Sequence, residues 1–400
     1  MSFTVADHLA RSLVARGFRR CFGYLGHHVE PLPQALLNGG LEVVIAASET
    51  GAGFMAQGWS LAGGRAGLVF CGGGPGLAML IPALQASRAE GFPLLAIIGQ
   101  TSTTGLPSFQ DTGALGSRDR ELLDALQIPA VSIGCPLELP AVLELACEAL
   151  AAGRPAALTI PADLLAAPWP AAGGESLPSQ QAYKHHRPVT GPVVPADPAA
   201  ADPAAVVQQP TEPGGYRAVV RALLASLPFG TLWFGDAGQA RHAMRMEFQE
   251  RGLPLFDCPQ SGPMGWAIAA AIGAAFHELD RPVCCFTGDG SARMLAHEWA
   301  TAVQHHLPIT FVLAVNGVLG GPYARLRESG AQALGHLPAV DWCGQAASMG
   351  LPACRVEGAQ EIVAALAALP SRGPRLLVLP LPALDPEVLA PYSLSRSASR

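Results

Sequence analysis

Hydrophobic and polar positions follow the same rhythm in two long stretches of the chain, which a polar, proline-rich segment separates. In each stretch, short apolar runs rich in β-branched residues alternate with amphipathic segments of helical length. This alternation is typical of strands buried in a parallel sheet and of the helices that connect them. It predicts strands at residues 20–24, 41–47, 67–71, 94–99, 130–133 and 156–160, and again at 231–234, 255–258, 282–287, 309–314, 354–356 and 375–380.

The composition changes abruptly between residues 168 and 215, where prolines are interleaved with Ala, Asp and Gln. Such a segment buries little apolar surface, and its prolines keep it extended. We therefore predict α/β domains at residues 1–167 and 216–388, a Pro/Ala-rich linker at 168–215 and a flexible tail at 389–400. Each domain is expected to be a three-layer α/β/α sandwich around a parallel sheet.

Composition and charge exclude several classes of protein. The net charge is -6, only 14% of the residues are charged, and no run is rich in Lys or Arg, so nucleic acid is not an expected partner. Residues 1–18 predict an amphipathic helix with Val5, Leu9 and Leu13 on one side, rather than a secretory signal, and we expect a cytoplasmic protein. The apolar stretches are too short or too interrupted to cross a membrane. The nine cysteines have no C-x-x-C spacing, which predicts buried free thiols.

The strongest motif in the chain joins Asp289 to Asn316. The predicted strand at 282–287 runs into Gly-Asp-Gly, a helix is predicted at about 291–305, and Asn316 follows the next strand. A strand–helix–strand unit returns the chain to the same sheet edge, so both side chains are predicted to meet there. Carboxylate and amide oxygens suit a hard divalent cation, and the glycines admit a diphosphate group. Each fragment alone is typical of an ordinary turn, but their spacing favours a shared site.

This motif resembles the diphosphate-binding motif of the thiamine diphosphate enzymes. The similarity is to the acetohydroxyacid synthase, benzoylformate decarboxylase and benzaldehyde lyase group, and it extends over both predicted domains. It implies that Asp289 and Asn316 ligate Mg2+ together with the backbone carbonyl of Val318. One departure is Val315, where the family commonly has a first asparagine. The cofactor contacts that the resemblance implies in the second domain are Gly238, Gln239, Gly262, Met264, Gly288, Gly290 and Ser291.

Four of these implied contacts have distinct roles. Gly238 and Gln239 precede a helix predicted to start near Arg241, and amides at a helix N-terminus bind phosphate oxygens. Met264 would be the wedge that bends the cofactor, and the Gly262 carbonyl would accept a hydrogen bond from its pyrimidine amino group. The alternatives are a surface turn for the Gly-Gln pair and an ordinary core methionine on a helix for Met264.

The first domain resembles the pyrimidine-binding domain of the same family. Glu49 lies where a predicted strand meets a helix, and Gly74 and Gly76 belong to a Gly-Pro-Gly turn. The resemblance implies that Glu49 hydrogen-bonds to the aminopyrimidine ring and activates the cofactor, and its small neighbours predict a poorly solvated carboxylate. The alternative is a first-turn residue favoured by the helix dipole. Since Glu49 and Asp289 lie in different domains, the family architecture implies sites between the subunits of a homodimer or homotetramer.

Two further residues are implied to face the substrate. His28 falls where benzaldehyde lyase has an active-site histidine, and Gln110 resembles a glutamine that meets substrate in that branch, while His27 replaces a small residue. Imidazole at this place could relay protons. The alternatives are a solvated loop histidine and a loop amide that caps its own backbone.

The reaction that we predict is decarboxylation of a 2-oxo acid, with or without carboligation, on a small 2-oxo acid or an aldehyde or acyloin. The linker replaces the family's central domain, so FAD is not expected, and two-domain chains resemble phosphonopyruvate and sulfopyruvate decarboxylases. Alternatives are a catalytically silent cofactor-binding subunit and, from the glycines at 72–76, a nicotinamide-dependent oxidoreductase, although G-x-G-x-x-G is incomplete there. Candidate partners for an anionic substrate group, in predicted loops, are Arg118, Arg120, Arg325 and Arg327.

Overall fold

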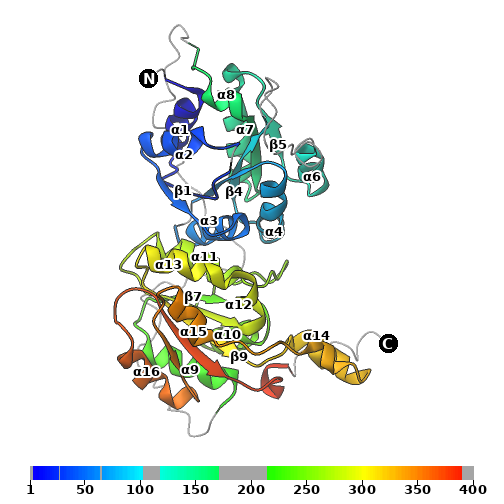
Figure 1. Ribbon diagram of the computed structural model, residues 1–400, viewed down its shortest axis with the longest axis vertical. Helices are drawn as coiled ribbons and strands as arrows, with labels where there is room; N and C mark the ends of the chain where they lie inside the picture. The colour runs from blue at the N-terminus through cyan, green and yellow to red at the C-terminus, as the bar shows by residue number, and fades with distance from the viewer. Residues whose placement is uncertain (1–2, 27, 64, 102–117, 171–213, 390–400) are drawn as a thin grey trace. The chain divides into compact units, whose positions relative to one another are not determined.

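The computed structural model describes residues 3–26, 28–63, 65–101, 118–170 and 214–389. They form two compact units that divide at residue 191, and each unit is built on one parallel sheet (Figure 1). The predicted fold class, two α/β domains with parallel sheets, is confirmed. Most of the predicted linker lies outside the described residues, so its bounds, like those of the tail, stay a prediction.

The sheet of the first unit has six strands in the order β2-β1-β3-β4-β6-β5, and all its pairs are parallel. β3, β4 and β6 lie in the middle and are almost fully buried, as continuous apolar runs in a parallel sheet require. The six strands correspond to the six predicted ones. They are β1 Arg20–Gly23, β2 Glu42–Ile45, β3 Gly67–Gly72, β4 Leu94–Gln100, β5 Ala130–Ser132 and β6 Ala156–Pro161.

Helices cover both faces of this sheet (Figure 1). On one face, α1 Val5–Ala15, α2 Pro31–Asn38, α7 Leu139–Ala151 and α8 Ala162–Ala166 share a core with alternate residues of β3, β4 and β6. The intervening strand residues point the other way, where α3 Glu49–Gly63 and α4 Pro75–Glu90 pack against β3. α6 Asp119–Ala125 precedes β5. The predicted N-terminal helix is confirmed, and its three marker residues Val5, Leu9 and Leu13 are fully buried.

The sheet of the second unit has five parallel strands in the order β10-β11-β9-β8-β7. The prediction of a strand at 255–258 is wrong, because only Phe256 forms an isolated bridge, with Phe234 of β7. Pro254 and Pro259 flank this bridge, and proline has no N–H to extend a ladder. The strands are β7 Leu232–Gly235, β8 Val283–Gly288, β9 Ile309–Val315, β10 Ala353–Arg355 and β11 Arg375–Pro380.

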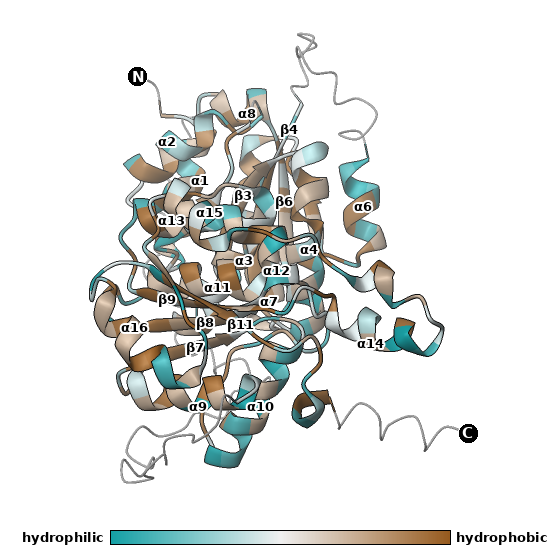
Figure 2. Ribbon diagram, turned by 60° about the horizontal axis from the view of Figure 1, so that its bottom comes forward, coloured by the Kyte–Doolittle hydropathy of each residue, from teal (hydrophilic) through white to brown (hydrophobic). Residues whose placement is uncertain are grey.

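The apolar strands of this second sheet are again covered on both faces (Figure 2). α9 Tyr216–Ser226, α10 Gln239–Arg251 and α16 Ile362–Ala368 share one core with β7, β8, β9 and β11. On the other face lie α11 Trp266–Ala275, α13 Trp299–Gln304 and α15 Trp342–Ser348. The Trp266 ring lies 6.0 Å from Phe234, and the Trp299 ring 6.1 Å from Phe311. α14 Gly320–Glu328 follows β9. Short 3-10 turns are Pro136–Glu138, Ala296–Glu298, Gln332–Gly335 and Ala359–Glu361.

The helix predicted at 291–305 is interrupted. α12 Asp289–Leu295 begins two residues earlier than predicted, and a 3-10 turn separates it from α13. The break lies at Leu295, where φ is -136° and the backbone leaves the helical region. Asp289 is thus the first residue of a helix, with its carboxylate at the positive end of the helix dipole.

The cysteine prediction is only partly right. All nine cysteines are free, and six are buried, but Cys135 is exposed and Cys343 and Cys354 are partly exposed. The prediction that the thiols are buried is therefore wrong for these three, because Cys135 lies in a surface turn, Cys354 lies in the short edge strand β10 and Cys343 lies in α15. Separately, none of the described helices combines the length and the apolar character that crossing a bilayer needs.

Candidate active site

Asp289 and Asn316 lie together at the carboxyl edge of the second sheet. β8 and β9 are parallel neighbours, so both chain segments leave the sheet on the same side. The Asp289 carboxylate accepts hydrogen bonds from the N–H of Gly317 at 2.9 Å and from the N–H of Gly290 at 3.1 Å. The Asn316 side-chain oxygen accepts from the N–H of Val318 at 3.0 Å. A direct hydrogen bond therefore connects the Gly-Asp-Gly fragment to the Asn-Gly fragment.

The donor set at this edge fits a hard divalent cation. Asp289 is 3% exposed, and burial raises the pKa of its carboxyl group, against the lowering effect of the N–H groups of Gly317 and Gly290. A buried carboxylate beside a side-chain amide oxygen and backbone carbonyls offers only oxygen ligands, as Mg2+ prefers. In the part of the chain that the structure describes, no group of three or more His, Cys, Asp and Glu side chains could hold a metal. A metal at this edge would thus rely on one carboxylate.

Small and buried residues surround the two side chains. Gly290 and Ser291 lie in the first turn of α12, and both are buried. A Cβ atom at Gly290 would lie 3.0 Å from the Leu319 side chain, so the position has little room for a larger residue. Gly288 differs, because a Cβ atom there would meet open space. Val318 is buried and is held by an isolated bridge to His336.

Asp236 is a residue of this edge that the sequence reasoning missed. It follows β7 directly and is 1% exposed. Its carboxylate accepts from the N–H groups of Ala237 and Gly265 and, at 2.8 Å, from the Thr287 hydroxyl in β8. Burial raises the pKa of Asp236 to about 6, although these bonds oppose the shift. A signal was present, because Gly-Asp followed by Ala-Gly after a strand repeats the pattern around Asp289.

The Gly238–Gln239 turn makes hydrogen bonds within the protein, and it also lies at a helix N-terminus, where anions bind. Gly238 has φ of +108°, which favours glycine, and Gln239 begins α10. The Gln239 side chain donates to the Ala383 carbonyl at 2.9 Å and accepts from the Asp385 N–H at 2.7 Å. Its amide is therefore committed to the segment after β11, and only backbone N–H groups of this turn remain for a phosphate.

Met264 does not lie on a helix and is not in the core. It is in the turn before α11 and is partly exposed, so the core-methionine alternative is wrong. Gly262, in the same loop, has φ of +59° and donates its N–H to the Cys258 carbonyl at 3.0 Å. Arg241 of α10 donates to that same carbonyl at 2.9 Å and so holds the loop.

In the first unit, Glu49 is the first residue of α3 and lies beside Gly76 of α4. A Cβ atom at Gly76 would come 3.4 Å from a Glu49 carboxylate oxygen, so this glycine leaves space next to the carboxylate. Burial raises the pKa of Glu49, against the lowering effect of its own backbone N–H. The helix dipole favours the ionised form, but desolvation outweighs it. This carboxyl group therefore holds a proton more readily than an exposed glutamate does.

Gly74, His28 and a second missed carboxylate, Asp119, lie at the same edge. Gly74 has φ of +62° and ψ of -113°, a conformation that favours glycine, and its N–H donates to Asp119 at 2.9 Å. Asp119 is 1% exposed, and burial raises its pKa, against hydrogen bonds from Gly74 and Gln100 and the charge of His28. His28 is 8% exposed, which excludes a solvated loop histidine. No motif in the sequence signals Asp119.

The remaining predicted residues do not join these groups. Gln110 and His27 lie outside the described residues. The loop placement of the four arginines proposed for an anionic substrate group is wrong for Arg120, Arg325 and Arg327, which lie on helices. Arg118 caps α6 and pairs with Glu121 at 3.4 Å, and Arg120 pairs with Asp124 at 2.9 Å. Arg325 and Arg327 lie in the last turn of the exposed helix α14.

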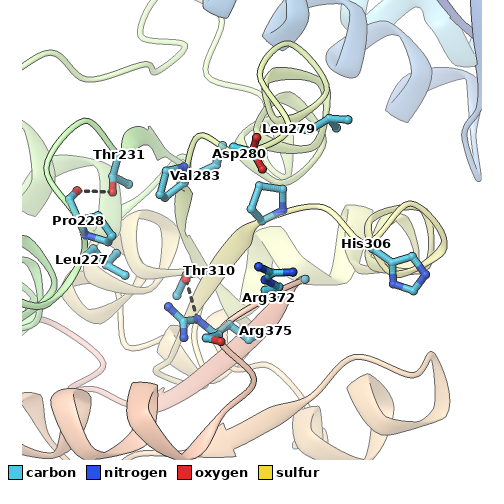
Figure 3. A pocket seen from close by; sticks show the side chains of 14 residues that line it. Leu227, Pro228, Thr231, Leu279, Asp280, Val283, His306, Thr310, Arg372 and Arg375 are labelled. Atoms are coloured by element: carbon cyan, nitrogen blue, oxygen red, sulfur yellow. Dashed lines mark hydrogen bonds between the residues drawn. The ribbon is translucent and has the colours of Figure 1, made fainter.

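A cavity of about 430 Å³ lies at the opposite edge of the second sheet (Figure 3). Its lining includes Thr231, Val283, Thr310 and Arg375, which stand at the amino ends of β7, β8, β9 and β11. Arg375 donates to the Thr310 hydroxyl at 3.0 Å, as the figure shows. None of the predicted site residues lines this cavity.

Comparisons with known proteins match both units to one family. Residues 3–124 match the N-terminal thiamine pyrophosphate-binding domain of thiamine pyrophosphate enzymes, and residues 236–379 match the C-terminal thiamine pyrophosphate-binding domain. Thiamine pyrophosphate is the same compound as thiamine diphosphate. Neither match covers residues 125–235, the interval in which a central domain would stand.

Curated relatives match parts of the chain. Acetolactate synthase isozyme 2 large subunit of Escherichia coli K12 is 31% identical over 157 residues, 38% of this chain and 27% of that protein. A probable 2-ketoarginine decarboxylase of Pseudomonas aeruginosa is 30% identical over 200 residues, 46% of this chain and 34% of its own length. The aligned residues thus span only about a quarter to a third of these relatives.

One solved structure matches nearly the whole chain. The thiamine diphosphate-dependent 4-hydroxybenzoylformate decarboxylase of Rhodococcus jostii RHA1 superimposes with a TM-score of 0.74 and 17% identity, over 95% of this chain and 99% of that one. At this identity, the likeness concerns the fold.

Proposed function

Because the chain belongs to the thiamine pyrophosphate enzyme family, and both of its units match that family's cofactor-binding domains, we propose that it is a thiamine diphosphate- and Mg2+-dependent enzyme. The reaction that we propose is cleavage or formation of a carbon–carbon bond next to a carbonyl, namely decarboxylation of a small 2-oxo acid, with or without carboligation. Both acetolactate synthases and decarboxylases among its relatives support this reaction class.

The observation that carries the proposal is the convergence of Asp289 and Asn316. Asp289 follows β8 and Asn316 follows β9, and the N–H of Gly317, the residue after Asn316, donates to the buried Asp289 at 2.9 Å in a setting that offers oxygen ligands. We propose that the Asp289 carboxylate, the Asn316 side-chain oxygen and the Val318 carbonyl hold Mg2+ there. The first turn of α12, with Gly290 and Ser291, and the N–H groups after Gly238 are proposed to receive the diphosphate.

When bound, thiamine diphosphate would supply a nucleophilic thiazolium carbon for addition to a carbonyl, and its positively charged ring would take up the electron pair released as the carbon–carbon bond breaks. The task proposed for Glu49 is to hold a proton against the aminopyrimidine ring. Its raised pKa supports this role, because burial makes the carboxyl group hold a proton more tightly, and this proton can be shared with a ring nitrogen. Gly76 keeps the space beside that carboxylate open.

Met264 and Gly262 are proposed to orient the pyrimidine ring. The partial exposure of Met264 in a turn supports contact with a ligand rather than with the core. His28 is proposed to move protons at the substrate, and it lies close enough to the buried Asp119 for its charge to lower the pKa of that carboxyl group. A catalytically silent subunit is less well supported, because it would have no need of a desolvated Glu49.

We also propose that the protein works as a homodimer or homotetramer. Glu49 and Asp289 belong to different compact units. In the family architecture, the first unit of one subunit faces the second unit of its partner across the cofactor. Neither unit alone then supplies both the proposed Mg2+ ligand Asp289 and the proposed proton donor Glu49.

The test is a titration of the purified protein with thiamine diphosphate and Mg2+, followed by a panel of pyruvate, benzoylformate, phosphonopyruvate and sulfopyruvate. We expect heat of binding, thermal stabilisation and release of CO2 from at least one acid. Acyloin products with CO2 indicate carboligation, and cleavage of an acyloin without CO2 indicates a lyase. No binding heat and no stabilisation would overturn the proposal.

A further inference from the structure

A second side chain fixes the orientation of Asn316. The Asn316 side-chain nitrogen donates to the hydroxyl of Tyr216 at 2.8 Å, and Tyr216 lies 100 positions earlier in the chain. At the other end of the same amide, the side-chain oxygen accepts from the Val318 N–H at 3.0 Å. A carboxamide has one donating end and one accepting end, so a partner for its nitrogen also decides where its oxygen points.

Tyr216 is itself held firmly. It is the first residue of α9 and is 1% exposed, and its ring lies 6.1 Å from Phe286 of β8. Its N–H donates to the Asp385 carboxylate at 2.9 Å. Asp385 in turn donates its own N–H to the Gln239 side chain at 2.7 Å. Four segments distant in sequence thus form one buried chain of hydrogen bonds that ends at Asn316.

Gly215 makes this arrangement possible. A Cβ atom at Gly215 would come 2.0 Å from an Asp385 carboxylate oxygen, closer than any real contact. The carboxylate can approach the start of α9 only because the residue before Tyr216 has no side chain. The other Asp385 oxygen accepts from the Glu387 N–H at 3.0 Å, which fixes the carboxylate from its second side.

The reversed orientation of the Asn316 amide is unfavourable in this setting. Turning the amide over would place its NH2 group against the Val318 N–H, so that two donors would face each other. Buried donors without acceptors are unfavourable, because they lose their hydrogen bonds to water and gain none in exchange. The Val318 N–H therefore selects the orientation of the amide, and the Tyr216 hydroxyl holds the nitrogen end in the place that this orientation gives it.

We propose that Tyr216 is a positioning residue for the metal site. By accepting from the Asn316 nitrogen, it keeps the Asn316 oxygen on the side of the Gly317–Val318 turn, to which Asp289 is also hydrogen-bonded. This inference rests on the proposed function, in which the Asn316 oxygen is a Mg2+ ligand. Groups that orient a metal ligand from behind commonly change metal affinity when they are removed.

The experiment is a Tyr216→Phe substitution, which keeps the buried ring and removes only the hydroxyl. Mg2+ is titrated calorimetrically into the full-length protein at saturating thiamine diphosphate. We expect the Mg2+ dissociation constant to rise roughly 10-fold or more. The matched control is Thr231→Val, which removes another buried hydroxyl of the same unit at the opposite sheet edge, where it donates to the Pro228 carbonyl (Figure 3). The control should bind Mg2+ like the parent.

The same substitution in a second variant distinguishes an effect on the orientation of the Asn316 amide from an effect on packing around Tyr216. In an Asn316→Asp protein both side-chain oxygens accept, so no amide needs to be oriented, and adding Tyr216→Phe should change Mg2+ affinity less than it does beside Asn316. An equal loss in both backgrounds would assign Tyr216 a merely structural role and overturn the inference. So would an unchanged affinity in Tyr216→Phe when the parent binds normally. A parent that binds neither Mg2+ nor thiamine diphosphate would overturn the proposed function, and this inference with it.

Discussion

The two sheets each carry acidic side chains at their carboxyl ends, and Glu49 of the first unit is held differently from the carboxylates of the second. In the second unit, Asp289 and Asp236 accept hydrogen bonds from backbone N–H groups of the neighbouring strand and helix segments. In the first unit, Glu49 lies beside the open space at Gly76, and its opposing hydrogen bond comes from its own backbone. Burial raises the pKa of all three groups.

The difference indicates a division of work between the units. Carboxylates tied to several backbone donors are fixed in place, which suits a charge that must anchor a cation and a diphosphate. A desolvated carboxyl group with few fixed partners is tuned in proton affinity and is free to make a new hydrogen bond. Substitutions in the second unit should therefore affect binding, whereas substitutions in the first unit should affect turnover.

The largest effect is expected from Glu49→Gln. The amide cannot share a proton as the acid does, so turnover should fall by about 10²- to 10⁴-fold, the range usual for acid–base groups. Affinity for thiamine diphosphate and Mg2+ should stay near the parent's, because their anchor lies in the other unit. Steady-state kinetics measures the expected loss of turnover, and calorimetry on the same preparation measures the affinity for thiamine diphosphate and Mg2+. Glu144→Gln, at a surface ion pair of α7, is the control. A variant as active as the parent would refute the role of Glu49.

Asp289→Asn should show the opposite pattern. Loss of the charge weakens the ion site, and affinity for Mg2+ should fall by about 100-fold. The thermal stabilisation that thiamine diphosphate and Mg2+ give to the parent should disappear. Asp341→Asn, which changes the N-cap of α15, serves as the control in a thermal shift assay. If the variant keeps full affinity but loses turnover, the division of work between the units is wrong.

Asp236→Asn tests whether the second carboxylate of that edge is structural. The pKa of Asp236 is raised from 3.8 to about 6, so the folded state binds its proton more tightly than the unfolded state does. The stability contribution is then fully present at low pH and is lost as pH rises through about 6. Going from pH 5 to pH 7.5, the parent should lose about 1–2 kcal/mol through this group.

The variant lacks this titration, and its amide oxygen can still accept from Ala237 and Gly265. Urea unfolding at both pH values should therefore show a smaller pH dependence for the variant than for the parent. The same pH dependence in both proteins would contradict the assignment.

The smallest effects are expected from a pair of glycine substitutions in the first unit. Gly74→Ala forces a side chain into φ of +62° and should lower the free energy of unfolding by about 1 kcal/mol. Gly76 has ordinary helical backbone, so Gly76→Ala should change stability by less than about 0.5 kcal/mol. It should instead lower turnover, because its Cβ approaches the Glu49 carboxylate. Turnover in Gly76→Ala equal to that of the parent would show that the space beside Glu49 has no special use.

Much of the fold was predictable because buried parallel strands are continuous apolar runs. All six strands of the first sheet and five of those predicted in the second are present. The failure at 255–258 arose because the apolar pattern is present there, while the prolines on either side prevent a ladder. The break in the helix after Asp289 left no mark in the residue pattern either, since Leu295 and its neighbours are good helix formers.

The candidate site was predictable only where a motif stands on one strand–helix–strand unit. Asp289 and Asn316 met this condition, because parallel topology determines where the chain returns. Asp119, Tyr216 and Asp385 did not, since their contacts join segments that only the folded chain brings together. The positions of the arginines were not predictable either, because three of the four assigned to loops lie on helices, and Arg118 and Arg120 pair with acidic neighbours.

The position of Asp385, close to the end of the described residues, limits how far the chain can be shortened. Asp385 lies after the last strand, yet it holds both the Tyr216 N–H and the Gln239 side chain. A polypeptide that ends just before Asp385 would keep every described strand. It would still lose the hydrogen bonds that hold Tyr216, at the start of α9, and Gln239, at the start of α10. We therefore expect truncation before Asp385, or fusion of a reporter protein close to it, to lower cofactor affinity, although no sequence motif marks this residue.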